Sequence, residues 1–97
     1  MNNIDGLILE MLEIKQQKNI VVQKQQYENA ANLRDKERDI EKNIFSMVFP
    51  DEEHDYVSFG TWLRSYLLER FGIEYNYDSV QLIRQIMRQI KLDELGI

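Results

Sequence analysis

The chain has 97 residues, enough for one small domain, and its 43 % hydrophobic and 30 % charged residues are typical of a folded globular protein. It contains no cysteine and one histidine, so disulfides, thiolate metal sites and multi-histidine zinc sites are excluded. The formal net charge is −5 and lies mostly in the second half: residues 1–48 carry seven Lys and Arg against eight Asp and Glu, and residues 49–97 carry five against nine. This balance makes nucleic acid an unlikely partner, because an acidic surface repels phosphate.

No apolar run approaches the roughly 20 residues that are needed to span a bilayer. The first residues also lack the basic region of a signal peptide. We therefore expect a soluble, cytoplasmic protein that does not contact a membrane.

Neither Gly nor Pro interrupts the chain from Leu7 to Val48, and apolar residues recur there at helical spacing. A single helix over residues 5–48 would be about 65 Å long, with too little else in so small a protein to pack against it. The segment 23–26 is polar all round, and folding the chain there gives two amphipathic arms over about 5–25 and 27–47. Periodicity favours the hairpin but leaves the continuous helix open.

Pro50 ends this region, because proline cannot donate the helical hydrogen bond. An acidic linker follows over residues 49–57, with the sequence DEEHD at 51–55. A calcium loop of the EF-hand type would need Glu at its twelfth position, and counting from Asp51 that position is Trp62. We therefore interpret the acidic run as a solvated linker and expect neither a metal site nor a cofactor.

Apolar residues then recur at helical spacing twice more. The first set predicts a helix over 58–71, with Ser58 as its N-cap and Gly72 as its C-cap. The second predicts a helix over 79–93, after a turn at residues 76–78. Asp78 or Ser79 marks the start of this helix, because both residue types are favoured at helix N-termini.

The expected fold is all-α and forms a single domain over residues 1–97. A long antiparallel helical hairpin (1–48) is joined by the acidic linker to a two-helix C-terminal region (58–97), whose helices pack at the base of the hairpin. The last two helices look too apolar to stand alone.

One segment of the predicted hairpin has a family resemblance. Residues 25–35 read QQYENAANLRD. This string resembles the signature of UVR motifs, which is an aromatic residue, Glu, a variable residue, two alanines, a variable residue, Leu, Arg and Asp. It is still more similar to the middle domain of ClpC-type Hsp100 unfoldases, and the similarity covers about residues 14–44.

The resemblance implies a helical hairpin that turns just before Tyr27 and serves protein–protein contact. It places Tyr27 and Glu28 at the tip, with Leu33, Arg34 and Asp35 further along the second arm, as the candidate interaction residues. The implied partners are a Clp unfoldase, its adaptor, a UVR-containing protein, or a second copy in a homodimer. The phosphate-binding loop of the unfoldases is absent from the sequence, and so is any nuclease module. We expect a non-catalytic adaptor or regulator.

The same residues could instead have purely structural roles. Tyr27 could pack its ring across the hairpin turn. The charges near Arg34 and Asp35 could belong to a solvated helix face, because three pairs of opposite charges stand three residues apart. Those pairs are Arg34 with Glu37, Asp35 with Arg38, and Asp39 with Lys42.

The second half offers little chemistry. Its aromatic residues are mixed with acids, which favours core packing over a platform for stacking bases. Arg84, Arg88 and Lys91 lie on one side of the last predicted helix, but the link before that helix is long for a helix-turn-helix. No serine, histidine or pair of carboxylates forms a catalytic motif, so we do not expect an enzyme. The alternative function is a small acidic inhibitor, of phage or mobile-element origin, that blocks a nucleic-acid or protein-binding groove.

Overall fold

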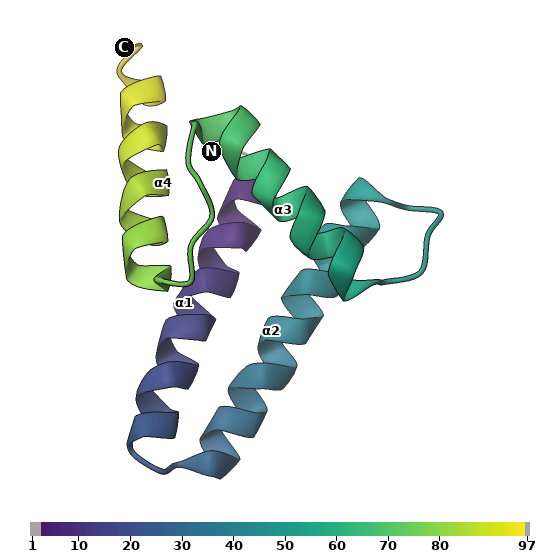
Figure 1. The fold of residues 1–97 in the computed structure, drawn as a ribbon, viewed down its shortest axis with the longest axis vertical. Helices are drawn as coiled ribbons and strands as arrows, with labels where there is room; N and C mark the ends of the chain where they lie inside the picture. Colours follow the sequence, from purple (N-terminus) through teal and green to yellow (C-terminus); the bar gives the residue numbers. More distant parts are fainter. Residues whose placement is uncertain (1–2, 97) are drawn as a thin grey trace.

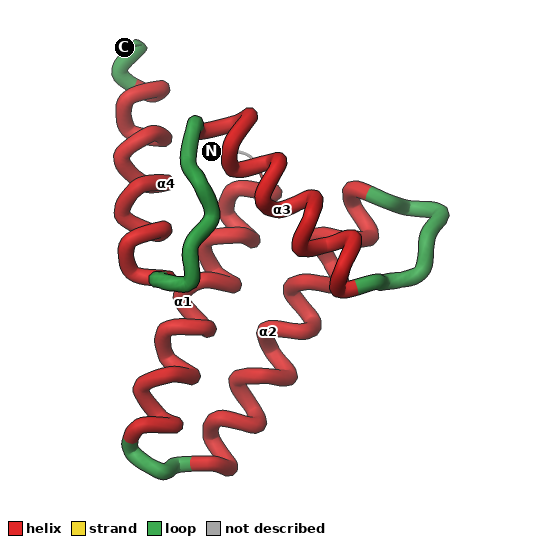
Figure 2. Tube along the Cα trace, viewed as in Figure 1, coloured by secondary structure: helices red, strands yellow, loops and turns green. Residues whose placement is uncertain are grey.

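The computed structural model describes residues 3–96, except for the side chain of Tyr56. Over these residues the chain forms four helices and no strand, which confirms the all-α prediction (Figures 1 and 2). They are α1 (Asn3–Gln23), α2 (Tyr27–Val48), α3 (Tyr56–Phe71) and α4 (Ser79–Glu94).

Helices α1 and α2 form an antiparallel hairpin, so the continuous helix is excluded (Figure 1). The chain reverses within residues 24–26, in the polar segment where a fold was predicted. The N–H of Gln26 bonds to the carbonyl of Val21 and that of Gln25 to the carbonyl of Val22, which is the Schellman pattern of a helix end. This pattern needs a left-handed residue, and Gln25 takes that role with φ 60°. The turn could not be located from a glycine in the sequence, because a glutamine occupies the left-handed position.

The capping residues of α3 and α4 agree with the sequence-based predictions at two of three positions. Gly72 caps α3 in a left-handed conformation, and Asp78 caps α4 by accepting from the N–H of Gln81. The prediction of Ser58 as the N-cap of α3 was wrong, because the helix already begins at Tyr56. Asp55 is the cap: its carboxylate accepts from the N–H of Val57 at 3.0 Å and from the hydroxyl of Ser58 at 2.9 Å. These two hydrogen bonds lower the pKa of Asp55.

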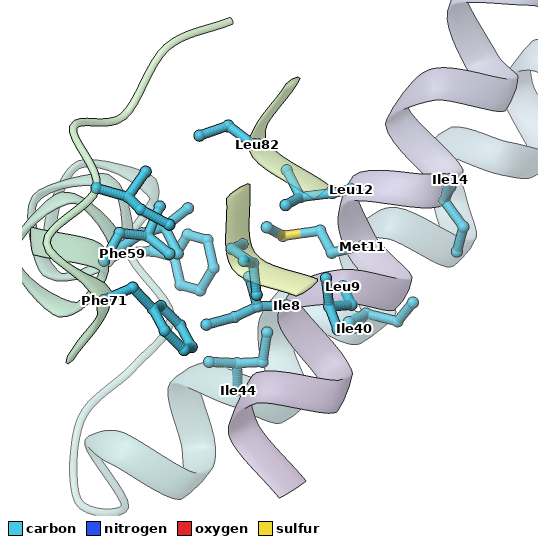
Figure 3. Packing of buried hydrophobic residues seen from close by; sticks show 14 of the residues in the cluster. Ile8, Leu9, Met11, Leu12, Ile14, Ile40, Ile44, Phe59, Phe71 and Leu82 are labelled. Atoms are coloured by element: carbon cyan, nitrogen blue, oxygen red, sulfur yellow. The ribbon is translucent and has the colours of Figure 1, made fainter. Parts of the chain in front are cut away.

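The core occupies only one end of the hairpin. Figure 3 shows side chains of α3 and α4, among them Phe59 and Leu82, gathered with Ile8 and Met11 of α1. Ile8 and Met11 are 0 % exposed, because α1 is covered from several sides. The buried hydrophobic residues of the hairpin are Ile8, Leu9, Met11, Leu12, Ile14, Ile40, Ile44 and Phe45. None of them lies between residues 15 and 39, so the far half of the hairpin is stabilised by two-helix contacts.

The C-terminal helices leave that far half uncovered. Helix α4 packs along the first half of α1 and runs antiparallel to it, while α3 crosses the open end of the hairpin (Figure 1). The molecule measures 43 × 33 × 19 Å along its principal axes. Within the described residues, no helix combines the length and the apolar character that crossing a bilayer demands.

A buried carboxylate ties three helices together at the open end. Asp5 of α1 is 0 % exposed, and it accepts a hydrogen bond from the hydroxyl of Tyr66 at 2.6 Å and one from Arg70 at 3.3 Å. Arg70 of α3 also donates to Asp93 of α4 at 3.2 Å. A buried charge is tolerated when it is paired and hydrogen-bonded, as Asp5 is.

Candidate protein-interaction site at the hairpin tip

The far end of the hairpin projects beyond the core as a free tip. Gln23 lies nine residues beyond Ile14, the last buried residue of α1, which corresponds to roughly 13 Å of helix. Three large apolar side chains are exposed there: Ile20 is 42 %, Val22 is 45 % and Tyr27 is 66 % exposed. We call these three residues the tip cluster. Ile20 and Val22 stand two residues apart and point away from each other on α1, so the projecting tip offers separate exposed apolar side chains and not one continuous patch.

The five residues chosen from the sequence differ in their surroundings. Tyr27 and Glu28 are exposed in the first turn of α2, so the ring of Tyr27 is not packed away across the turn. Arg34 and Asp35 are also exposed, and they face one another at 4.0 Å. Leu33 is half-buried and packs against the core cluster, so its contacts lie within the domain.

An ion-pair cluster braces the hairpin between the core and the tip. Glu37 of α2 pairs with Lys15 at 2.7 Å and with Lys18 at 2.8 Å, both on α1. Glu37 does not pair with Arg34 along α2, because its carboxylate turns toward the other arm. Burial opposes the charge of Glu37, but its two lysine partners outweigh burial and lower its pKa. Burial also opposes the charge of Lys15, and Glu37 outweighs it there, so the pKa of Lys15 is raised.

Glu41 lies one turn further along α2 and has no such partner. It is 9 % exposed and forms no ion pair or hydrogen bond with the described residues. Burial raises its pKa, an effect that nearby Lys15 only partly offsets. Glu41 lines a small cleft with Lys15, Arg64 and Tyr75. The guanidinium of Arg64 stacks over the ring of Tyr75 at 5.6 Å, and charges of both signs share the cleft.

Sequence reasoning missed two members of the tip cluster, Ile20 and Val22. Their signal was the run Ile20-Val21-Val22 at the end of the first arm. Three consecutive apolar residues point in three directions on a helix, so the facing helix can cover only part of the run. In the structure Val21 is half-buried and its two neighbours are exposed.

Comparisons of the chain with protein-family models, with curated proteins and with solved structures give no match. Within residues 3–96 no group of three or more His, Asp or Glu side chains is placed to hold a metal ion. The site must therefore be interpreted from its own geometry, which is a projecting apolar tip on a braced helical hairpin.

Proposed function

We propose that this protein is a non-catalytic protein–protein interaction module, an adaptor or regulator, that binds its partner through the hairpin tip. The observation that carries the proposal is the tip cluster. Its three large apolar side chains stand exposed on an element that projects beyond the core. In this view α3 and α4 act as a base: they supply the core at the open end of the hairpin and leave the tip free.

The sequence of the hairpin suggests which class of protein could be the partner. The resemblance of residues 14–44 to UVR motifs and to the middle domain of ClpC-type unfoldases motivates a Clp unfoldase, its adaptor or a UVR-containing protein as the partner. A second copy of this chain, pairing tip to tip, is the homodimer form of the same proposal. In all these cases Tyr27 is the expected anchor, because aromatic residues dominate the binding energy of protein interfaces.

Two tyrosines allow a matched experiment. Tyr27 is 66 % exposed at the tip and Tyr77 is 84 % exposed in the loop before α4. Purified wild type, Tyr27→Ala and Tyr77→Ala are tested for binding to a ClpC-type unfoldase and to a UVR-motif protein by biolayer interferometry. Self-association is followed by analytical ultracentrifugation.

We expect Tyr27→Ala to weaken binding or self-association at least tenfold and Tyr77→Ala to change it less than twofold. Absence of both unfoldase and UVR binding, together with a monomer at all concentrations, overturns the proposed partners and the homodimer. Equal effects of the two substitutions overturn the tip as the binding site.

The exposed acidic loop favours the alternative function, an acidic inhibitor of phage or mobile-element origin. Asp51, Glu52 and Glu53 are exposed and make no ion pair with the described residues, whereas Asp55 is engaged in capping α3. An inhibitor working through this loop would lose activity when Asp51, Glu52 and Glu53 are replaced by Lys and would tolerate Tyr27→Ala. The tip proposal expects the reverse.

A further inference from the structure

Helix α4 presents a second surface that the tip proposal does not use. Ile83, Met87 and Ile90 stand at spacings of four and three residues, and Arg84, Arg88 and Lys91 repeat this spacing one residue later. Residues at such spacings share a helix face, so an apolar strip runs beside a cationic strip. These six residues, with Glu94 at the end, line an open hollow along α4 of about 660 Å³.

The apolar strip reaches solvent on the outer shoulder of the helix. Met87 is 51 % exposed and Ile83 is half-buried, while Ile90 at 8 % forms the inner edge against the core. The residues of α4 that anchor it to the rest of the protein are Leu82, Ile86 and Ile90. Ile83 also packs against the core cluster, so Met87 is the apolar residue of the strip that remains open to a partner.

The cationic strip is uncompensated within a chain that is acidic overall. Arg84, Arg88 and Lys91 are exposed and form no ion pair with the described residues, although the chain has a net charge of −5. The neighbouring acid Asp93 pairs with Arg70, and Glu94 at the end of the hollow forms no ion pair with the described residues. Three free cations beside an apolar strip are complementary to acidic side chains that flank an apolar one.

We propose that this face of α4 is a second docking surface, which takes an acidic amphipathic helix of a different protein. An apolar residue of that helix would enter the hollow beside Met87, and its carboxylates would meet Arg84, Arg88 and Lys91. Helix-in-groove recognition of this kind works through anchors at positions i, i+3 or i+4 and i+7. The surface and the tip lie at different ends of the molecule, so both can be engaged at once (Figure 1).

Other occupants fit the face less well. Two copies of this chain paired through α4 would place Arg84 and Arg88 against cations. A membrane would need a wide apolar face, and Leu82, Ile86 and Ile90 are already buried in the core, which leaves too little to insert. Nucleic acid would use the cations, but the net acidic chain repels it and the apolar strip would be unmatched.

The test uses the whole protein with its methionine methyl groups labelled with carbon-13. The probe is a synthetic 14-residue helical peptide with Glu on one face and Leu on the other. One comparison peptide has the same composition in an order that breaks the helical spacing, and a second has Lys in place of Glu. Met47 is 48 % exposed on α2 and serves as the matched reporter for Met87 at 51 %.

We expect the acidic amphipathic probe to shift the Met87 methyl signal and not that of Met47, with binding that weakens as salt is raised. The double substitution Arg84→Glu/Arg88→Glu should weaken binding at least tenfold. Arg38→Glu/Lys42→Glu, which has the same spacing on α2, should change it less than twofold. Tyr27→Ala should leave it unchanged, so this surface and the tip can fail independently.

Several outcomes overturn the proposal. They are absence of binding up to millimolar probe, equal binding of the reordered or Lys-containing peptide, and equal shifts at Met47 and Met87. Tighter binding to vesicles of phosphatidylserine and phosphatidylcholine, or to random duplex DNA, would assign the face to a membrane or to nucleic acid. Self-association that disappears in Arg84→Glu/Arg88→Glu would assign it to a second copy. Circular dichroism confirms that each variant is folded.

Discussion

At the base of the hairpin, Ile8, Met11 and Leu12 of α1 are at most 1 % exposed, whereas at its tip Ile20 and Val22 of the same helix are 42 % and 45 % exposed. The base holds more large apolar residues than the tip, and the neighbours of the two ends also differ: α2, α3 and α4 surround the base, and only α2 accompanies the tip. Burial of an apolar side chain contributes about 1.5–3 kcal/mol, so the base supplies the stability of the fold. The tip contributes little to stability and is therefore free to serve binding.

The difference in stability between the base and the tip is tested most strongly by removing one aromatic ring from each end of the hairpin. Phe45 is 2 % exposed at the base and packs on Phe49 and on the edge of His54, with ring centroids 4.9 and 5.3 Å apart. Phe45→Ala should lower the free energy of unfolding by about 3–5 kcal/mol, because it opens a cavity. Tyr27→Ala at the tip should change it by less than about 0.5 kcal/mol. Urea denaturation followed by circular dichroism measures both, and similar losses would contradict the division of the hairpin.

The buried carboxylate at the base should have the next largest effect. Asp5→Ala removes the acceptor of Tyr66 and Arg70 and should cost about 1.5–3 kcal/mol, the range of hydrogen bonds to charged groups. Asp39 is exposed on α2, and Asp39→Ala should cost less than about 0.5 kcal/mol. Thermal unfolding of both variants checks this, and a loss at Asp5 no greater than at Asp39 would show that the three-helix tie does not contribute.

Two glutamates between base and tip should respond to pH in opposite directions. The pKa of Glu37 is lowered, so its stabilising contribution is present above the pKa of unfolded glutamate and is lost as pH falls through the folded value. The pKa of Glu41 is raised by burial, so stability from its neutral form is present at low pH and is lost as pH rises through the folded value.

At pH 7, Glu37→Gln should therefore destabilise the protein by about 1–2 kcal/mol, and Glu41→Gln should stabilise it by up to about 1 kcal/mol. Both differences from wild type should shrink below about pH 4, where carboxylates become protonated. Urea titrations at pH 7, 5 and 3.5 measure these changes. A loss of stability in both variants at pH 7 would contradict the assignment of one paired and one unpaired carboxylate.

The smallest expected effect lies in the turn of the tip. Gln25 has φ 60°, a conformation in which glycine avoids the steric cost of a Cβ. Gln25→Gly should raise the free energy of unfolding by about 0.5 kcal/mol, whereas Gln17→Gly in the exposed middle of α1 should lower it by about 1 kcal/mol. Thermal unfolding compares the two, and destabilisation by Gln25→Gly would show that the glutamine makes contacts that outweigh its strain.

Much of the local structure could be predicted from residue types and spacing. Helical periodicity placed all four helices within a few residues of their observed bounds, and Pro50, Gly72 and Asp78 marked their ends. These signals are local, because a cap or a proline acts on hydrogen bonds within one turn of helix. The sequence predicted Ser58 as the cap of α3, whereas Asp55 caps it, because the helix extends further toward the linker.

Tertiary structure decided the relations between the helices. Asp5 lies 61 residues from Tyr66 and 65 from Arg70, and Glu37 lies 19 residues from Lys18, so no local pattern could pair them. Likewise, the helical spacing of the hairpin arms predicts an apolar face on each arm, but it does not predict which of these apolar residues are covered. That depends on where α3 and α4 pack. From the sequence, Tyr27 and Glu28 were expected at the tip of the hairpin. Ile20 and Val22 are exposed at the same end because α3 and α4 pack against the opposite end.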